Sequence, residues 1–260
     1  MLFDYVLIDW RVRTGRRNCL NKPTRETTIC IMSAASNTFE NVKAVILSAH
    51  EGTTSKEKVN FYNSWAQNYD QDVAVLDYRA PCLAANSISS HFSDEREAAV
   101  VLDVACGTGL VAKQMKNHGF RHFVGIDGSE VMLEMARESS LYQDLKQALL
   151  GEEPLPAQWE NVFDVVVIVG ALSAGQVPVY VVRDLCRSTK PGGYICMTTR
   201  SNRDNLEYKA ALESELRKME EEGLCTCVEV TQVKDWEKAV SEHEDGYISG
   251  AVYLYRKLQV

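Results

Sequence analysis

Two short segments constrain this chain more than any other feature. Residues 100–109 read VVLDVACGTG, an apolar run that ends in an acidic residue and a glycine turn. Apolar positions recur at helical spacing after Gly109, so this segment predicts a strand, a tight loop and the start of a helix. About 20 positions further on, a second apolar strand, Phe123–Ile126, ends in Asp127 and Gly128. The sequence therefore predicts two strands joined by a helix, with an acidic residue near the carboxyl end of each.

The acidic residue after the second strand indicates the kind of ligand. In dinucleotide-binding folds, an acid at this place faces the vicinal hydroxyls of a ribose. Asp127 therefore predicts a nucleoside-containing cofactor. A pyrophosphate also requires three spaced glycines whose amides point at charged oxygens, and the third glycine is absent here. Asp103, which lies just before the loop, would repel a pyrophosphate and attract the ammonium group of an amino acid.

The loop and two later motifs resemble those of a known family. Residues 103–109, in the form D-x-A-C-G-T-G, resemble motif I of the class I S-adenosylmethionine-dependent methyltransferases. Residues 163–169 resemble that family's fourth strand, and residues 190–193, KPGG, resemble its turn before the fifth. The resemblance implies S-adenosylmethionine as the cofactor and S-adenosylhomocysteine as its product. It also implies an α/β, three-layer Rossmann-like fold whose seven-stranded sheet has the order 3-2-1-4-5-7-6, with strand 7 antiparallel.

From residue 38 onward, predicted helices and strands alternate in a way that indicates a parallel sheet with helices on both faces. Helices are predicted at 42–49, 59–69, 77–90, 110–118, 129–138, 179–188 and 204–221. Further strands are predicted at 124–127, 163–169 and 194–199, with a weak one near 147–150. The alternating, β-rich segments 225–233 and 247–255 resemble the final antiparallel pair of the methyltransferase fold.

Residues 1–37 form a predicted N-terminal extension that we expect to be disordered. No core-like periodicity appears at its start, where five arginines gather at Arg11, Arg13, Arg16, Arg17 and Arg25. A mitochondrial presequence is the alternative interpretation, and Asp4, Asp9 and Glu26 argue against it. The remainder, residues 38–260, is predicted to be one methyltransferase domain that begins with a helical lid.

The two loops carry most of the predicted cofactor site. Asp127 is predicted to hold both ribose hydroxyls, and Gly107 and Gly109 to let the cofactor approach the backbone. Asp103 is predicted to bind the ammonium group. Cys106 is predicted to contact the cofactor without acting as a nucleophile, because direct methyl transfer needs no covalent enzyme intermediate. The other predicted contacts of the loops and of the fourth strand are Ala105, Gly128, Ser129 and Val169.

The resemblance adds two further groups of contacts. It implies that Leu150 and Gly151, after the third strand, lie against the adenine. Tyr62, Trp65 and Tyr69 recur at helical spacing, for which core packing is the ordinary interpretation. In the resembled family, however, the helix before the first strand closes over the cofactor. We therefore predict that Trp65 and Tyr69 line the pocket on this lid, and that Tyr62 belongs to the core.

The sequence identifies neither a catalytic base nor a metal site. A base is needed only where the acceptor must first lose a proton. The five histidines show no metal-ligand spacing. Residues 170–173 lack the N/D-P-P-Y/F signature of enzymes that methylate planar amino groups, and the paired acids of magnesium-dependent catechol methylation are missing. An adenine, glutamine or catechol acceptor is therefore disfavoured.

Composition narrows the partners. A net charge of -8 disfavours a nucleic-acid surface, which needs clustered lysine and arginine. No apolar stretch reaches the roughly 18 residues of a membrane span, so we expect no membrane partner. The eight cysteines contain no CxxC pair, and we expect reduced thiols and a cytoplasmic or nuclear location. The expected methyl acceptor is a small molecule, with a protein as second choice, and the oligomeric state is not indicated.

Two functions of other classes stay open at this point. One is a protein that binds S-adenosylmethionine without turnover, which the absence of an identifiable base would explain. The other is a nicotinamide-dependent dehydrogenase, which Asp103 and the missing third glycine disfavour.

Overall fold

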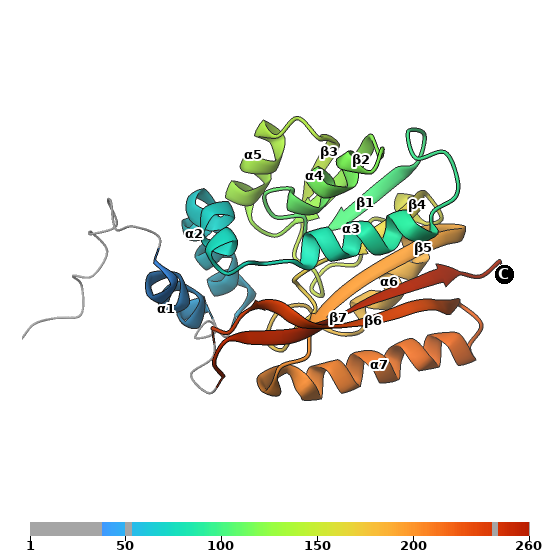
Figure 1. Ribbon diagram of the computed structural model, residues 1–260. Coiled ribbons are helices and arrows are strands. Elements are labelled where there is room, and N and C mark those ends of the chain that lie inside the picture. Colours follow the sequence, from blue (N-terminus) through green and yellow to red (C-terminus); the bar gives the residue numbers. More distant parts are fainter. Residues whose placement is uncertain (1–37, 50–53, 241–243, 260) are drawn as a thin grey trace, which may run out of the picture. The chain divides into compact units, whose positions relative to one another are not determined.

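The computed structural model describes residues 38–49, 54–240 and 244–259, all within one compact unit, Asn37–Val260 (Figure 1). The predicted N-terminal extension, residues 1–37, lies outside the described residues, so the predictions of disorder and of targeting stay predictions. No helix in the described part of the chain is both long and apolar enough to cross a membrane.

A seven-stranded sheet forms the centre of the unit, in the order β3-β2-β1-β4-β5-β7-β6. The first five strands are parallel, and β7 is antiparallel to both of its neighbours. This arrangement confirms the predicted fold. The strands are β1 (Val100–Val104), β2 (His122–Asp127), β3 (Tyr142–Gln147), β4 (Phe163–Ile168), β5 (Thr189–Arg200), β6 (Cys225–Lys238) and β7 (Tyr247–Lys257).

Helices cover both faces of the sheet because its central strands are apolar on both sides. In β4, Val165 and Val167 pack into one core with α3 and α4, whereas Val166 and Ile168 pack into the other core with α6 and α7 (Figure 1). The helices are α1 (Phe39–Ala49), α2 (Ser55–Val75), α3 (Ala80–His91), α4 (Leu110–Asn117), α5 (Glu130–Glu138), α6 (Val181–Ser188) and α7 (Leu206–Glu221). Two short 3-10 helices, Ala157–Trp159 and Arg203–Asn205, complete the described elements.

The parallel strands bring the loops after β1, β2 and β4 to one edge of the sheet, where α2 also lies. A capping box starts α2: the Thr54 hydroxyl accepts a hydrogen bond from the Glu57 amide, and the Glu57 carboxylate accepts one from the Thr54 amide. The helix then packs beside α5, which follows β2 (Figure 1). Helix α2, which precedes the sheet in sequence, is thereby placed over the carboxyl ends of the strands, where open α/β sheets bind ligands.

The position predicted for the third strand is wrong. The strand occupies Tyr142–Gln147 and not 147–150, because β3 is an edge strand that pairs with β2 alone. Its sequence, YQDLKQ, is mostly exposed, so it carries none of the apolar signal that marks the buried strands. The apolar residues that suggested a strand, Ala148 to Leu150, follow it, and Ala148 and Leu150 pack against the core that includes α6 and α7.

Two other boundaries differ from prediction for local reasons. The third helix begins at Ala80 and not at residue 77, because Asp77 has φ +54° and Pro81 lies in the first helical turn. The fifth strand begins at Thr189, so the KPGG segment lies inside its bounds, where the register with β4 shifts between Phe163 and Val165.

Candidate functional site

A cavity of about 880 Å³, which we call the first cavity, opens at the carboxyl edge of the sheet. The loops that follow β1, β2, β3 and β4 form its floor, and α2 forms one wall. The lining includes Lys58, Val59, Tyr62, Tyr69, Ala105, Gly107, Asp127, Gly128, Ser129, Met132, Leu149, Leu150, Val169, Gly170, Gln176 and Val177.

The loop after β1 turns its backbone toward this cavity. Ala105, Gly107 and Gly109 all have positive φ, at +55°, +52° and +96°. Gly109 ends the loop as the N-cap of α4. A Cβ built on Gly107 would meet no heavy atom within 4 Å, so the space beside this residue is open. The left-handed conformation thus favours glycine here, and its bare backbone faces room for a ligand.

Asp127 joins the two loops. One carboxylate oxygen accepts a hydrogen bond from the Gly107 amide at 2.9 Å, and the other accepts one from the Ser129 amide at 2.8 Å. Burial raises the pKa of Asp127, and the backbone amides around it oppose that shift. An ionised carboxylate offers about four acceptor positions, so two remain for donors on a ligand.

Two side-chain hydrogen bonds fasten α2 to these loops. The Ser129 hydroxyl donates to Asn63 Oδ1 at 2.6 Å, and the Thr108 hydroxyl donates to Asp70 Oδ1 at 2.6 Å. Ser129 also accepts from the Met132 amide as the N-cap of α5. The helix that forms the wall of the cavity is therefore positioned by the same loops that form its floor.

The structure brings eight of the thirteen predicted cofactor residues to the first cavity. They are Tyr69, Ala105, Gly107, Asp127, Gly128, Ser129, Leu150 and Val169. The other five, Trp65, Asp103, Cys106, Gly109 and Gly151, do not line it. For these five, contact with a cofactor remains a prediction.

Asp103 lies beneath the loop and is only 1% exposed. One of its carboxylate oxygens accepts a hydrogen bond from the Tyr142 hydroxyl at 2.7 Å, and the other has no hydrogen-bond partner among the described residues. Burial raises the pKa of Asp103 to about 7, and the Tyr142 hydrogen bond lowers it by less. Cys106 is also buried, and burial raises the pKa of its thiol well above the usual value, which agrees with a packing role and not with a nucleophile.

The aromatic residues of α2 divide in a way that the sequence did not indicate. Trp65 is 8% exposed, donates from Nε1 to Asp72 Oδ2 at 2.7 Å, and stacks edge-on with Tyr69 at 4.8 Å. Tyr62, predicted as a core residue, lines the first cavity together with Tyr69. Among the other predicted contacts, Gly151 has φ +86°, and a Cβ there would lie 2.7 Å from Pro178, so packing accounts for this glycine.

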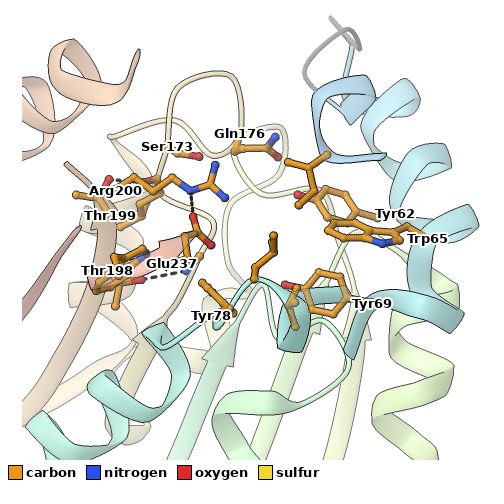
Figure 2. A pocket seen from close by; sticks show the side chains of 16 residues that line it. Tyr62, Trp65, Tyr69, Tyr78, Ser173, Gln176, Thr198, Thr199, Arg200 and Glu237 are labelled. Atoms are coloured by element: carbon orange, nitrogen blue, oxygen red, sulfur yellow. Dashed lines mark hydrogen bonds and ion pairs between the residues drawn. The ribbon is translucent and has the colours of Figure 1, made fainter. Parts of the chain in front are cut away.

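A second cavity of about 710 Å³ adjoins the first (Figure 2). The two cavities share Tyr62, Tyr69, Gly170 and Gln176 as lining residues. The second is otherwise enclosed by residues of α1 and α2, the loop after β4 and the ends of β5 and β6. Its lining includes Ile46, Trp65, Val73, Leu76, Tyr78, Leu172, Ser173, Thr198, Thr199, Arg200, Trp236 and Glu237.

An ion pair forms one side of the second cavity. Arg200 Nε lies 2.6 Å from Glu237 Oε1, and Glu237 is 1% exposed. Glu237 raises the pKa of the Arg200 guanidinium, so this side chain is charged throughout the ordinary pH range. Sequence reasoning missed both residues, as well as Tyr78 and Trp236. No local motif marks them, because β7 lies between β5 and β6 and only the sheet order brings Arg200 near Glu237.

The arrangement of sheet, glycine loop and acidic residue defines a class I S-adenosylmethionine-dependent methyltransferase. The chain belongs to the Methyltransferase domain family, which matches residues 95–248. It is 49% identical over 183 residues to human Methyltransferase-like protein 27, a match that covers 70% of this chain and 74% of that protein. This membership decides against the dehydrogenase interpretation.

A more distant relative is also a methyltransferase, and two solved methyltransferase structures share the fold. The Ubiquinone biosynthesis O-methyltransferase of Alkalilimnicola ehrlichii is 32% identical over 146 residues, which cover 55% of this chain and 54% of that protein. The methyltransferase solved with the Trm112 activator of Haloferax volcanii has a TM-score of 0.55 at 16% identity and covers 76% of this chain and 98% of its own. A methyltransferase of Thermotoga maritima has a TM-score of 0.51 at 17% identity, covering 75% and 98%. These two structures show the shared fold.

The buried carboxyl of Asp103 predicts a pH-dependent stability. Its pKa is about 7 in the folded protein, above the ordinary value of 3.8, so between these values the folded state holds a proton that the unfolded state has lost. The free energy of unfolding should therefore fall as pH rises through this window. Asp103→Asn removes the titration and leaves an oxygen to accept from Tyr142.

Urea denaturation of both proteins at about pH 5 and about pH 8 measures the effect. Relative to the wild type, Asp103→Asn should gain about 1–3 kcal/mol of stability between the two conditions. Groups whose titration does not depend on Asp103 cancel in this difference. An equal stability difference at both pH values would show that Asp103 ionises normally in the fold.

Proposed function

We propose that this methyltransferase binds S-adenosylmethionine in the first cavity and transfers its methyl group to a small molecule held in the second. The observation that carries the proposal is the shared wall: Tyr62, Tyr69, Gly170 and Gln176 contact both cavities. Direct transfer requires that donor and acceptor lie in adjoining spaces, with the reacting atoms roughly 3 Å apart. Two cavities with common lining residues supply the adjoining spaces.

The first cavity offers groups that suit the ribose, the methionine portion and the adenine of the cofactor. The two free acceptor positions of Asp127 would receive the ribose hydroxyls. The open space beside Gly107 would let the methionine portion approach the backbone. Leu149 and Leu150 offer apolar surface to the adenine, and Leu150 was predicted for this role. Asp103 would serve the ammonium group through a local rearrangement, since in this structure it contacts Tyr142.

The protein's part in the chemistry is to bind, orient and exclude water. When bound, S-adenosylmethionine supplies an already activated methyl group, so no nucleophile of the chain is required. The rings of Tyr62 and Tyr69, which lie on the predicted lid, would keep solvent from the space between the cavities. Burial raises the pKa of both phenols, so both hydroxyls are protonated and neither is assigned as a general base.

A small-molecule acceptor is favoured by the relatives and by the charge of the chain. The similar Ubiquinone biosynthesis O-methyltransferases act, by their name, in the synthesis of a small molecule, although the match spans about half of their length. The net charge of -8 argues against nucleic acid as a partner. A protein acceptor, and a cytoplasmic or nuclear location, remain predictions of the sequence.

Substitution of Gly107 tests the cofactor site. Gly107→Ala places a methyl group in the open space, so binding of S-adenosylhomocysteine should weaken about tenfold or more. Gly223→Ala is the matched control, because Gly223 also has positive φ, at +73°, and no heavy atom near its Cβ, but does not line either cavity. Both variants should lose about 1 kcal/mol of stability from backbone strain. Equal affinity of the two variants in calorimetric titration would remove Gly107 from the site.

The acceptor class is tested with methyl-tritiated S-adenosylmethionine and a cell extract separated into small molecules, proteins and RNA. We expect wild-type protein to transfer label to the small-molecule pool. Gly107→Ala at limiting cofactor should transfer less and Gly223→Ala as much as wild type. Label in protein or RNA would contradict a small-molecule acceptor, and absence of label from every pool would favour a protein that binds the cofactor without turnover.

A further inference from the structure

The guanidinium of Arg200 lines the second cavity, and its ion pair with Glu237 involves only some of its nitrogens. A guanidinium carries five N–H donors, and only the Nε of Arg200 lies against the Glu237 carboxylate. Within the described residues, nothing forms a hydrogen bond or ion pair with its terminal nitrogens. Figure 2 shows these nitrogens projecting toward the centre of the cavity, opposite the rings of Tyr62 and Tyr69.

The remaining polar groups of the cavity are rich in donors. The hydroxyls of Tyr62, Tyr69 and Tyr78 form no hydrogen bond with any residue that the structure describes. Burial raises the pKa of all three, so each hydroxyl keeps a proton to donate. Glu237 is the one carboxylate in the lining, and Arg200 already neutralises it. A ligand that fills this space must therefore bring hydrogen-bond acceptors, because unpaired buried donors are unfavourable.

The terminal nitrogens of Arg200 form the free edge of its guanidinium, and the geometry of this edge indicates which acceptor group fits. The two terminal nitrogens of a guanidinium form a planar fork that matches the two oxygens of a carboxylate. A phosphate dianion would place two negative charges beside Glu237, which lies 2.6 Å from the same guanidinium. A monoanionic carboxylate adds only one. Trp65, Leu76 and Trp236, which also line the cavity, offer apolar and aromatic surface to the body of the ligand.

We propose that the methyl acceptor is a small molecule with a carboxylate and an apolar body, and that Arg200 binds the carboxylate through its terminal nitrogens. Glu237 is a positioning residue in this arrangement, since it holds Nε and turns the free edge toward the cavity. The proposal rests on the proposed function, because it places the acceptor in the second cavity. It concerns how the acceptor is recognised and does not specify which of its atoms receives the methyl group.

Arg200→Lys is the informative substitution. Lysine keeps the positive charge that Glu237 needs, so the buried carboxylate is not left alone, but it lacks the planar fork. Arg217→Lys is the control, because Arg217 is exposed on α7 and lines neither cavity. The acceptor source is the small-molecule extract, divided by anion-exchange resin into a retained pool and a flow-through. A part of the retained pool is treated to convert carboxylates to amides, and another part with phosphatase.

The expected result has three components. Wild-type protein methylates a component of the retained pool, amidation removes this acceptor, and phosphatase leaves it intact. Arg200→Lys needs about tenfold or more of the retained pool for half-saturation, while its dissociation constant for S-adenosylhomocysteine stays within about twofold of wild type. The retained pool also raises the melting temperature of the wild type and of Arg217→Lys loaded with S-adenosylhomocysteine, but not that of Arg200→Lys. This last measurement does not depend on turnover.

Different failures contradict different claims. If the methylated component is found in the flow-through, survives amidation or is destroyed by phosphatase, the carboxylate proposal is wrong while methyl transfer to a small molecule stands. The same holds if Arg200→Lys saturates at the wild-type amount. If the wild type labels no small molecule in either pool, the proposed function fails, and the inference that rests on it fails too.

Discussion

The carboxylate of Asp127 is the constraint on which the site depends. It accepts the amides of Gly107 and Ser129, which belong to loops about 20 residues apart in sequence. A charged acceptor shared by two backbone donors is a strong and directional contact. It fixes the open turn at Gly107 and the start of α5 relative to each other. The same group then faces the cavity with acceptor positions to spare.

The position of α2 follows from this arrangement. The Ser129 hydroxyl donates a hydrogen bond to Asn63, and the Thr108 hydroxyl donates one to Asp70. The loops fixed by Asp127 therefore also position α2. That helix contributes aromatic rings to both cavities, and Tyr62 contacts each of them. The two cavities are therefore coupled through one helix. A shift of α2 would change both spaces together.

The second cavity depends on a different feature, the order β5-β7-β6 at one end of the sheet. Arg200 ends β5, and its backbone pairs with Gly250 of β7, which in turn pairs with β6. An added Cβ at Gly250 would clash with the Trp236 indole, so the glycine lets β7 pass beneath this ring. The antiparallel pair thus delivers Trp236 and Glu237 to the carboxyl edge of the parallel sheet. Arg200 and Glu237 therefore come from strands, β5 and β6, that contribute nothing to the loops of the first cavity.

These origins explain what the sequence could predict. The glycine loop and Asp127 were predictable, because they depend on local motifs with short spacing. The sheet order was predictable from the family resemblance that these motifs carry. Strand β3 was misplaced, because an exposed edge strand has no apolar pattern. The contact of Tyr142 with Asp103 was missed for the same reason.

Other parts of the site were beyond local patterns. Tyr62, assigned to the core, lines both cavities, and helical spacing cannot distinguish a core ring from a cavity wall. The pair of Arg200 with Glu237 depends on strand order over nearly forty positions. A resemblance to a family supplies that order, but it does not show which side chains meet.

The most direct test of the account is a double comparison of Asp127 and the ribose. Calorimetric titration would measure the binding of S-adenosylhomocysteine and of its 2′-deoxy analogue to the wild type and to Asp127→Asn, with the melting temperature of the unliganded variant as the check of its fold. If the carboxylate binds the ribose, loss of the hydroxyl should weaken binding to the wild type by about tenfold to hundredfold and to Asp127→Asn by less than about twofold. An equal loss in both proteins would show that Asp127 only braces the loops and that the ribose lies elsewhere.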